Sequence, residues 1–148
     1  MLEIYGNLWE YHNNARWIAI TTNGQYTKYG RAIMGAGCAK EAADRHKEIP
    51  GIVGAHVKSH GNVPLLMAGY RIITFPTKNN WKDKANLALI EKSARLIKAK
   101  IEECNIDDLV IPRPGCGCGG LDWERDVKPV LATIFDTGRY SIICPPRA

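Results

Sequence analysis

Long apolar runs, a regular cysteine framework and clustered basic residues are all missing from this chain of 148 residues. No apolar run approaches the roughly 20 residues of a membrane-spanning helix. The first residues, MLEIY, lack the basic and apolar regions of a secretory signal. The five cysteines are odd in number and irregularly spaced, which argues against a disulfide framework and for a reducing compartment. We therefore expect a cytoplasmic protein that does not associate with membranes.

Internal repeats, low-complexity tracts and linkers are also absent, so we expect a single domain over residues 1–148 that acts as a monomer. Its formal net charge of +5 suits an anionic ligand. Lysine and arginine are spread along the chain, without the basic run or the aromatic-rich signature of RNA-binding domains. A small anionic ligand is therefore favoured over nucleic acid as the primary ligand.

Strand-like and helix-like segments alternate along the sequence. Apolar residues at spacings of three and four predict one long amphipathic helix, with Asp83 near its N-cap, and Gly61 is expected to end the helix before it. The predicted strands are 16–22, 65–67, 71–75, 109–111 and 140–144, and the predicted helices are 38–46, 50–61, 87–104 and 127–135. This order predicts an α/β fold with helices on a largely parallel sheet, whose ligand binds beyond the carboxyl ends of the strands.

A glycine-rich loop, PRPGCGCGGLDW over residues 112–123, directly follows a predicted strand. Because glycine has no Cβ, its backbone N–H groups can approach a ligand closely and form a concavity for an anion. We expect the following helix to add the positive end of its dipole, and Asp122 and Trp123 to lie at the rim. The loop is therefore predicted to bind phosphate.

Two further loops are expected to meet the glycine-rich loop at the same edge of the sheet. The first, residues 23–37, contains MGAGCA, which suits either a close ligand approach or a tight loop-to-helix junction. Its Asn23 could bond a sugar hydroxyl or serve as a turn residue. The second loop contains Lys78, either a desolvated nucleophile or a solvated surface lysine, and Trp81, either a stacking wall or a cover for the core.

Metal and cofactor sites are not expected. Cys116 and Cys118 are one residue apart, without a second pair at zinc-site spacing. His56 and His60 could share a helix face, but no glutamate follows His56 as in HExxH.

The motifs GNLWE, MGAGCA, IITFPTKNNW and PRPGCGCGGLDWERDVKPVL, in this order, resemble the macro domain family over nearly the whole chain. The pattern is most similar to the lysine-dependent branch. That branch includes the terminal ADP-ribose protein glycohydrolase, the antitoxin of a DNA-ADP-ribosylating toxin–antitoxin pair, and single-domain bacterial and phage proteins. The resemblance implies a three-layer α/β/α sandwich with a mixed, mostly parallel central sheet that binds ADP-ribose.

The resemblance also implies site residues. Lys78 matches the catalytic lysine, which attacks the anomeric carbon of the distal ribose, and Asp122 matches the aspartate that assists proton transfer. The implied binding residues are Asn7, Leu8, Asn23, Met34, Gly35, Ala36, Gly37, Pro114, Gly115, Cys116, Gly117, Cys118, Gly119 and Gly120.

One position departs from the family pattern. Many macro domains have aspartate where this chain has Asn7, and that carboxylate binds the adenine amino group. Asparagine keeps an acceptor oxygen but loses charge assistance, which costs about 1 kcal/mol. The resemblance implies removal of ADP-ribose from a modified protein or nucleic acid. A reader without turnover and an ADP-ribose 1''-phosphate phosphatase are the alternatives.

Overall fold

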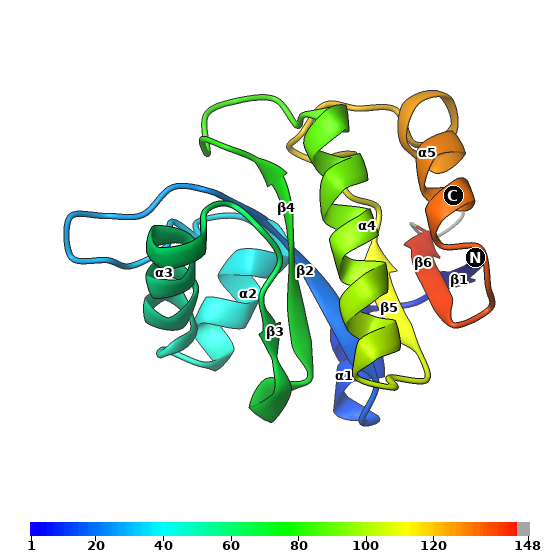
Figure 1. Cartoon of the computed structure of the whole chain (residues 1–148), viewed down its shortest axis with the longest axis horizontal. Helices are drawn as coiled ribbons and strands as arrows, with labels where there is room; N and C mark the ends of the chain where they lie inside the picture. The colour runs from blue at the N-terminus through cyan, green and yellow to red at the C-terminus, as the bar shows by residue number, and fades with distance from the viewer. Residues whose placement is uncertain (145–148) are drawn as a thin grey trace.

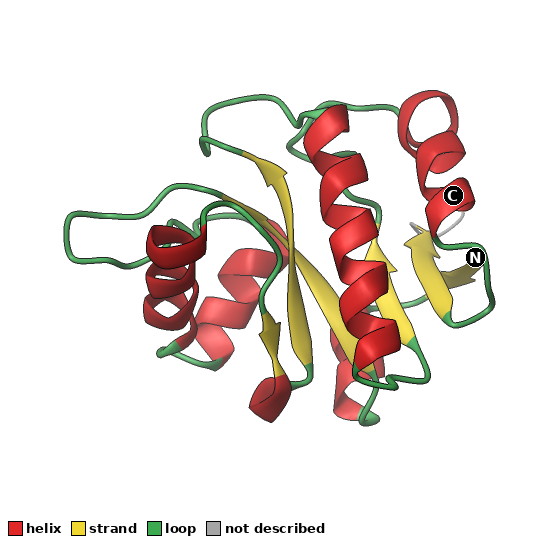
Figure 2. Cartoon of the chain, viewed as in Figure 1, coloured by secondary structure: helices red, strands yellow, loops and turns green. Residues whose placement is uncertain are grey.

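The computed structural model describes residues 1–144, which form one six-stranded sheet with helices packed against it (Figures 1 and 2). The strands are β1 (Leu2–Tyr5), β2 (Trp17–Asn23), β3 (Leu66–Met67), β4 (Ile72–Lys78), β5 (Leu109–Pro112) and β6 (Tyr140–Cys144). They lie in the order β1-β6-β5-β2-β4-β3, and every pair is parallel except β3 with β4. The predicted mixed, mostly parallel sheet is therefore confirmed.

The helices pack on the two faces of this sheet as separate layers (Figure 1). They are α1 (Leu8–Asn13), α2 (Gly37–Arg45), α3 (Ile49–His60), α4 (Leu87–Glu103) and α5 (Lys128–Ile134), with a 3-10 turn η1 (Ala68–Tyr70) and a π-helical turn η2 (Trp123–Val127). Helices α4 and α5 share one apolar core with the sheet, and α1, α2 and α3 share the other. This arrangement is the three-layer α/β/α sandwich implied by the sequence.

Alternation along the central strands explains why both faces need a helical layer. In β2, Ile18 and Ile20 are fully buried toward α1, α2 and α3, whereas Ala19 between them is buried toward α4. In β4, Ile72 and Ile73 likewise face opposite sides. Successive strand side chains point to opposite faces, so a strand that is apolar at every position requires cover on both.

The helix boundaries follow local capping chemistry. Helix α3 ends at Gly61 with φ of +86°, as predicted. The N-cap of helix α4 is Asn86, three residues after the predicted Asp83. The side chain of Asn86 accepts a hydrogen bond from the N–H of Leu89 at 3.0 Å. That prediction was wrong: an asparagine satisfies the first turn of the helix equally well.

Within the described residues, no helix combines the length and apolar character needed to cross a bilayer. Residues 145–148 of the domain expected over 1–148 lie outside the described part of the chain.

Candidate functional site

A cleft of about 870 Å³ opens at the carboxyl ends of β2, β4 and β5. Its walls are the three loops that follow these strands, so the predicted meeting of the loops at one edge is found. From the first loop, Asn23, Met34, Gly35, Ala36 and Gly37 line the cleft. From the other two come Lys78, Gly115, Gly117, Cys118 and Gly119.

Lys78 is placed by an irregularity at the end of β4. Thr22 pairs with Pro76 and Asn23 pairs with Lys78, so Thr77 is an extra residue in β4. Pro76 has no N–H to donate to the ladder, and such bulges redirect the side chains that follow. Lys78 is half-buried, lines the cleft, and its amine makes no hydrogen bond or ion pair within residues 1–144. The lysine is therefore available to a ligand.

The backbone around Lys78 is held from two sides. The side-chain amide of Asn62 donates to the carbonyl of Lys78 at 2.8 Å. On the other side, the N–H of Asn86 donates to the carbonyl of Thr77 at 2.9 Å, and the Ser93 hydroxyl donates to the Pro76 carbonyl at 2.8 Å. Sequence reasoning missed Asn62, since nothing in the chain near it signals a contact with β4. These bonds fix the position from which the lysine side chain enters the cleft.

The N-terminus of α2 supplies one anion-binding wall. Ala36 stands at the N-cap and its side chain makes no capping hydrogen bond. The first N–H groups of a helix have no acceptor within the helix and carry the positive end of its dipole. Because Ala36 and Gly37 line the cleft, these N–H groups are open to a ligand there.

The glycine-rich loop supplies the facing wall. None of the backbone N–H groups of residues 116–119 donates a hydrogen bond within the described chain. The loop keeps its shape through Gly115, which has φ of +77° and whose carbonyl accepts from the N–H of Leu121 at 2.9 Å. A Cβ at Gly119 would lie 2.5 Å from the Gly115 carbonyl oxygen, whereas a Cβ at Gly117 would meet nothing within 4 Å. Gly119 therefore serves packing, and Gly117 leaves space for a ligand.

The charge of the cleft favours an anion. Its lining contains the cations Lys78, Lys82, Lys84 and Arg113 but only one carboxylate, Asp83. The buried Nε of Arg113 has no hydrogen-bond partner within residues 1–144, although another nitrogen of its guanidinium lies 4.0 Å from the Glu3 carboxylate. The guanidinium carbon lies 5.1 Å from the centroid of the Trp123 ring. Sequence reasoning missed Arg113, although its place between β5 and the glycine-rich loop was a usable signal. A phosphorylated ligand would offset this positive charge.

Six of the predicted residues do not line the cleft: Asn7, Leu8, Pro114, Cys116, Gly120 and Asp122. Asp122 is exposed and caps η2, since its carboxylate accepts from the N–H of Arg125 at 2.7 Å. The dipole expected after the glycine-rich loop is therefore directed at Asp122, and that part of the prediction was wrong. Trp123 is also not at the rim: it is buried in the core and its ring N–H donates to Glu3 at 2.9 Å.

The two asparagines of the predicted site both make local hydrogen bonds. Asn7 is the N-cap of α1, and its side-chain oxygen accepts from the N–H of Trp9 at 2.8 Å. Asn23 donates to the carbonyl of Ile33 and accepts from the N–H of Gln25, both at 2.9 Å. Asn23 therefore acts as a turn residue, which is one of its two predicted roles. Because Asn23 also lines the cleft, a hydrogen bond to a sugar hydroxyl of the ligand remains a proposal.

The cysteines near the cleft are thiols. Burial raises the pKa of Cys116 to about 11, and burial also raises the pKa of Cys38. No three His, Cys, Asp or Glu side chains within residues 1–144 lie close enough together to hold a metal ion.

Fold and cleft together define an α/β/α domain whose cleft has a cationic lining at the carboxyl ends of the strands. The chain belongs to the macro domain family, whose model matches residues 30–130. The resemblance inferred from the order of the motifs is thereby confirmed.

Among curated proteins, the chain is 42% identical over 64 residues to a DNA ADP-ribosyl glycohydrolase of Mycobacterium tuberculosis. The matched segment covers 43% of this chain and 18% of that protein. It is 39% identical over 52 residues to a DNA ADP-ribosyl transferase-DNA ADP-ribosyl glycohydrolase fusion protein of Thermosipho africanus, covering 35% of this chain and 13% of that protein. The matches thus span less than a fifth of these relatives.

Solved structures match over nearly the whole chain. The macrodomain of Mycobacterium tuberculosis DarG has a TM-score of 0.79 at 26% identity, with 99% of both chains covered. The macrodomain of Thermus aquaticus DarG has a TM-score of 0.76 at 21% identity, with 99% of this chain and 97% of that chain covered.

Proposed function

We propose that this chain is an ADP-ribosyl glycohydrolase that removes ADP-ribose from modified DNA, with Lys78 as the nucleophile. The observation that carries the proposal is the amine of Lys78, which has no partner among the described residues and lies in a cleft walled by two sets of backbone N–H groups that also have none there. Similarity to proteins named DNA ADP-ribosyl glycohydrolase supports both the reaction and the acceptor. Protein remains the other acceptor class that the experiment below includes.

The diphosphate of ADP-ribose is proposed to bind between α2 and the glycine-rich loop. N–H groups of residues 116–119 on one side and of Gly37 and Ala39 on the other have no acceptor within residues 1–144, so they can donate to its oxygens. This places the distal ribose beside Lys78 at the end of β4. Trp81, which lines the cleft and is 49% exposed, offers a flat apolar wall for the ligand.

The proposed reaction proceeds in two stages. The neutral amine of Lys78 attacks the anomeric carbon of the distal ribose, and the bond to the acceptor breaks with its electron pair leaving on the acceptor, which takes up a proton. The furanose ring of this adduct then opens, which gives an iminium between Lys78 and the anomeric carbon. Water adds to the iminium carbon, and the resulting carbinolamine expels the lysine amine, which takes up a proton as ADP-ribose is released. The amine must first lose a proton, because only an unprotonated amine is nucleophilic.

Two carboxylates are candidates for the proton transfers. Asp122 is the family match but caps η2, whereas Asp83 lines the cleft. Asp122 would serve only if the loop carried its carboxylate to the ribose in the complex.

The test is to incubate the protein with ADP-ribosylated single-stranded DNA, an ADP-ribosylated protein and ADP-ribose 1''-phosphate, and to measure the product of each by mass spectrometry. The proposal predicts free ADP-ribose from the DNA. Release of ADP-ribose from the modified protein alone would refute DNA as the acceptor. Release of phosphate alone would favour a phosphatase, and binding of ADP-ribose without any release would favour a reader.

A further inference from the structure

Two loops beside the cleft carry exposed aromatic rings next to lysines that form no ion pair with a carboxylate of residues 1–144. The hairpin-like loop of residues 24–32 presents Tyr29, which is 80% exposed, and the Lys28 amine lies 5.1 Å from the Tyr29 ring centroid. The loop of residues 79–84 presents Trp81, and the Lys82 amine lies 5.4 Å from its ring centroid. Among the described residues, Ala32 at the end of the first loop packs in one apolar core, whereas Tyr29 and Trp81 are members of neither core.

The two loops are joined at the cleft. The N–H of Gly24 donates to the carbonyl of Asn79 at 3.2 Å, and the N–H of Trp81 donates to the side chain of Gln25 at 3.4 Å. The first loop leaves the cleft wall at Asn23 and returns to it at Ile33, while Trp81 lies in the lining itself. The aromatic and basic side chains therefore form one surface that continues outward from the cleft.

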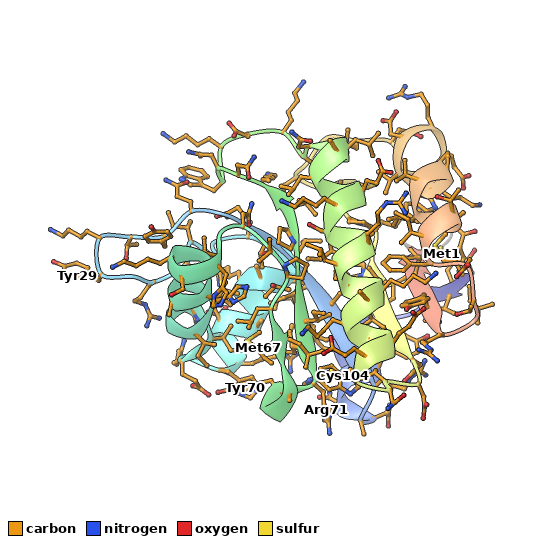
Figure 3. All side chains as sticks on the ribbon, viewed as in Figure 1. Met1, Tyr29, Met67, Tyr70, Arg71 and Cys104 are labelled. Atoms are coloured by element: carbon orange, nitrogen blue, oxygen red, sulfur yellow. The ribbon has the colours of Figure 1, made fainter. Side chains whose placement is uncertain are left out.

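Backbone hydrogen bonds hold the first loop, although its tip with Tyr29 projects from the molecule (Figure 3). The N–H of Thr27 donates to the carbonyl of Arg31 at 2.8 Å, and the N–H of Gly30 donates back to the carbonyl of Thr27 at 2.9 Å. The N–H of Ala32 donates to the carbonyl of Pro50 at the start of α3, also at 2.8 Å. A loop whose backbone is already anchored loses less conformational entropy when a partner stacks on its exposed ring.

The charges point to the partner. Lysines on the helices outside this surface are mostly neutralised by carboxylates, as in the pairs Lys40–Asp44 and Lys98–Asp136. By contrast, Lys28, Lys82 and Lys84 have no carboxylate within 4.0 Å in the described chain. Rings interleaved with unpaired cations are the features that bind single strands, because bases stack on the rings and phosphates contact the cations.

We propose that this surface, formed by Tyr26, Lys28, Tyr29, Trp81, Lys82 and Lys84, binds the single-stranded DNA that flanks the modified base. The inference rests on the proposed function, since it assigns the strand to the same cleft. A single strand is required because the rings stack on unpaired bases, which a duplex does not offer. The modified base enters the cleft, and its neighbours lie along the surface.

The experiment measures binding of a fluorescent, unmodified oligothymidylate by anisotropy, at several salt concentrations and against its duplex. Wild type should prefer the single strand, with a slope of log affinity on log salt of roughly −2, from about 0.7 for each of three lysines. Tyr29→Ala should weaken binding about fivefold or more, and Lys28→Glu should flatten the slope. The matched controls Lys58→Glu and Lys92→Glu reverse unpaired lysines on α3 and α4 and should bind the strand as wild type does.

Three results would overturn the proposal: equal strand affinity in Tyr29→Ala, equal losses in the Lys92→Glu control, or preference for the duplex. Measuring ADP-ribose release from a modified strand separates the two claims. If strand binding depends on Tyr29 but no ADP-ribose is released, the proposed function is refuted and the proposed DNA-binding surface is supported. If Tyr29→Ala releases ADP-ribose from a modified strand as wild type does, the proposed DNA-binding surface is refuted and the proposed function is supported.

Discussion

Gly117 and Gly119 provide a matched pair that separates ligand approach from loop packing. Both are in the glycine-rich loop and both line the cleft. A Cβ at Gly119 would lie 2.5 Å from the Gly115 carbonyl oxygen and 2.7 Å from the Ala85 Cβ, whereas a Cβ at Gly117 would meet nothing within 4 Å. The same substitution to valine should therefore change different properties at the two positions.

For Gly119→Val, the neighbours that must move are backbone and a buried alanine. Overpacking of this kind costs about 1–3 kcal/mol of unfolding free energy, which lowers the Tm of a chain of this size by roughly 3–12 °C. Any loss of ADP-ribose binding in this variant follows from the distorted loop. Differential scanning fluorimetry measures the Tm.

For Gly117→Val, the Tm should stay close to that of wild type, because the side chain projects into open space. The valine would hold the diphosphate away from the N–H groups of residues 116–119. Losing one charge-assisted hydrogen bond, worth about 1.5–3 kcal/mol, weakens ADP-ribose binding by about ten- to a hundredfold. Calorimetry with wild-type affinity in a folded Gly117→Val protein would refute the assignment of the cleft.

Asn7→Asp keeps the N-cap of α1 and should leave the Tm unchanged. Because Asn7 does not line the cleft, ADP-ribose binding should also stay as in wild type, and a few-fold tightening in calorimetry would show that the side chain reaches the adenine amino group in the complex. Asp83→Asn and Asp122→Asn should be compared in a release assay. Turnover should fall about 10²–10⁴-fold in the variant that lacks the proton-transferring carboxylate, and wild-type turnover in both variants would exclude both residues from that role. Hydrogen bonds from Trp123 and Lys128 lower the pKa of Glu3, so its contribution to stability is present above the ordinary value of 4.5 and is lost as pH falls through the lowered pKa. Glu3→Gln should therefore destabilise the protein at neutral pH and flatten the acid side of the stability curve measured by urea unfolding.

The meeting of the three loops could be predicted because the carboxyl ends of parallel strands share one edge of a sheet. The predicted placement of Trp123 at the rim was wrong for a local reason. Trp123 and Val127 are four residues apart and both buried, so the apolar face of the last helical segment begins at Trp123. Asp122 then falls at the N-cap, a position that favours aspartate without any catalytic role.

The bulge that places Lys78 had a signal in the sequence that was not used. Pro76 lies inside an otherwise regular strand, where proline often marks an interrupted ladder. The surface around Tyr29 and Trp81 had no such signal. Lys28 and Lys82 are far apart in sequence, so the spread of basic residues along the chain concealed a surface that forms only when the two loops join.

The central claim is that Lys78 forms a covalent bond to the distal ribose, and borohydride trapping followed by mass spectrometry tests it most directly. The account predicts an adduct at Lys78 in wild type and in Lys92→Ala. It predicts no adduct and no release of ADP-ribose in Lys78→Ala or Lys78→Arg, although both variants bind ADP-ribose within a few-fold of wild type. Arginine keeps the positive charge of the lysine but stays protonated and cannot attack the ribose. Lys78→Arg therefore distinguishes the effect of the charge from the effect of the nucleophile. Release of ADP-ribose at the wild-type rate by Lys78→Arg would contradict the account.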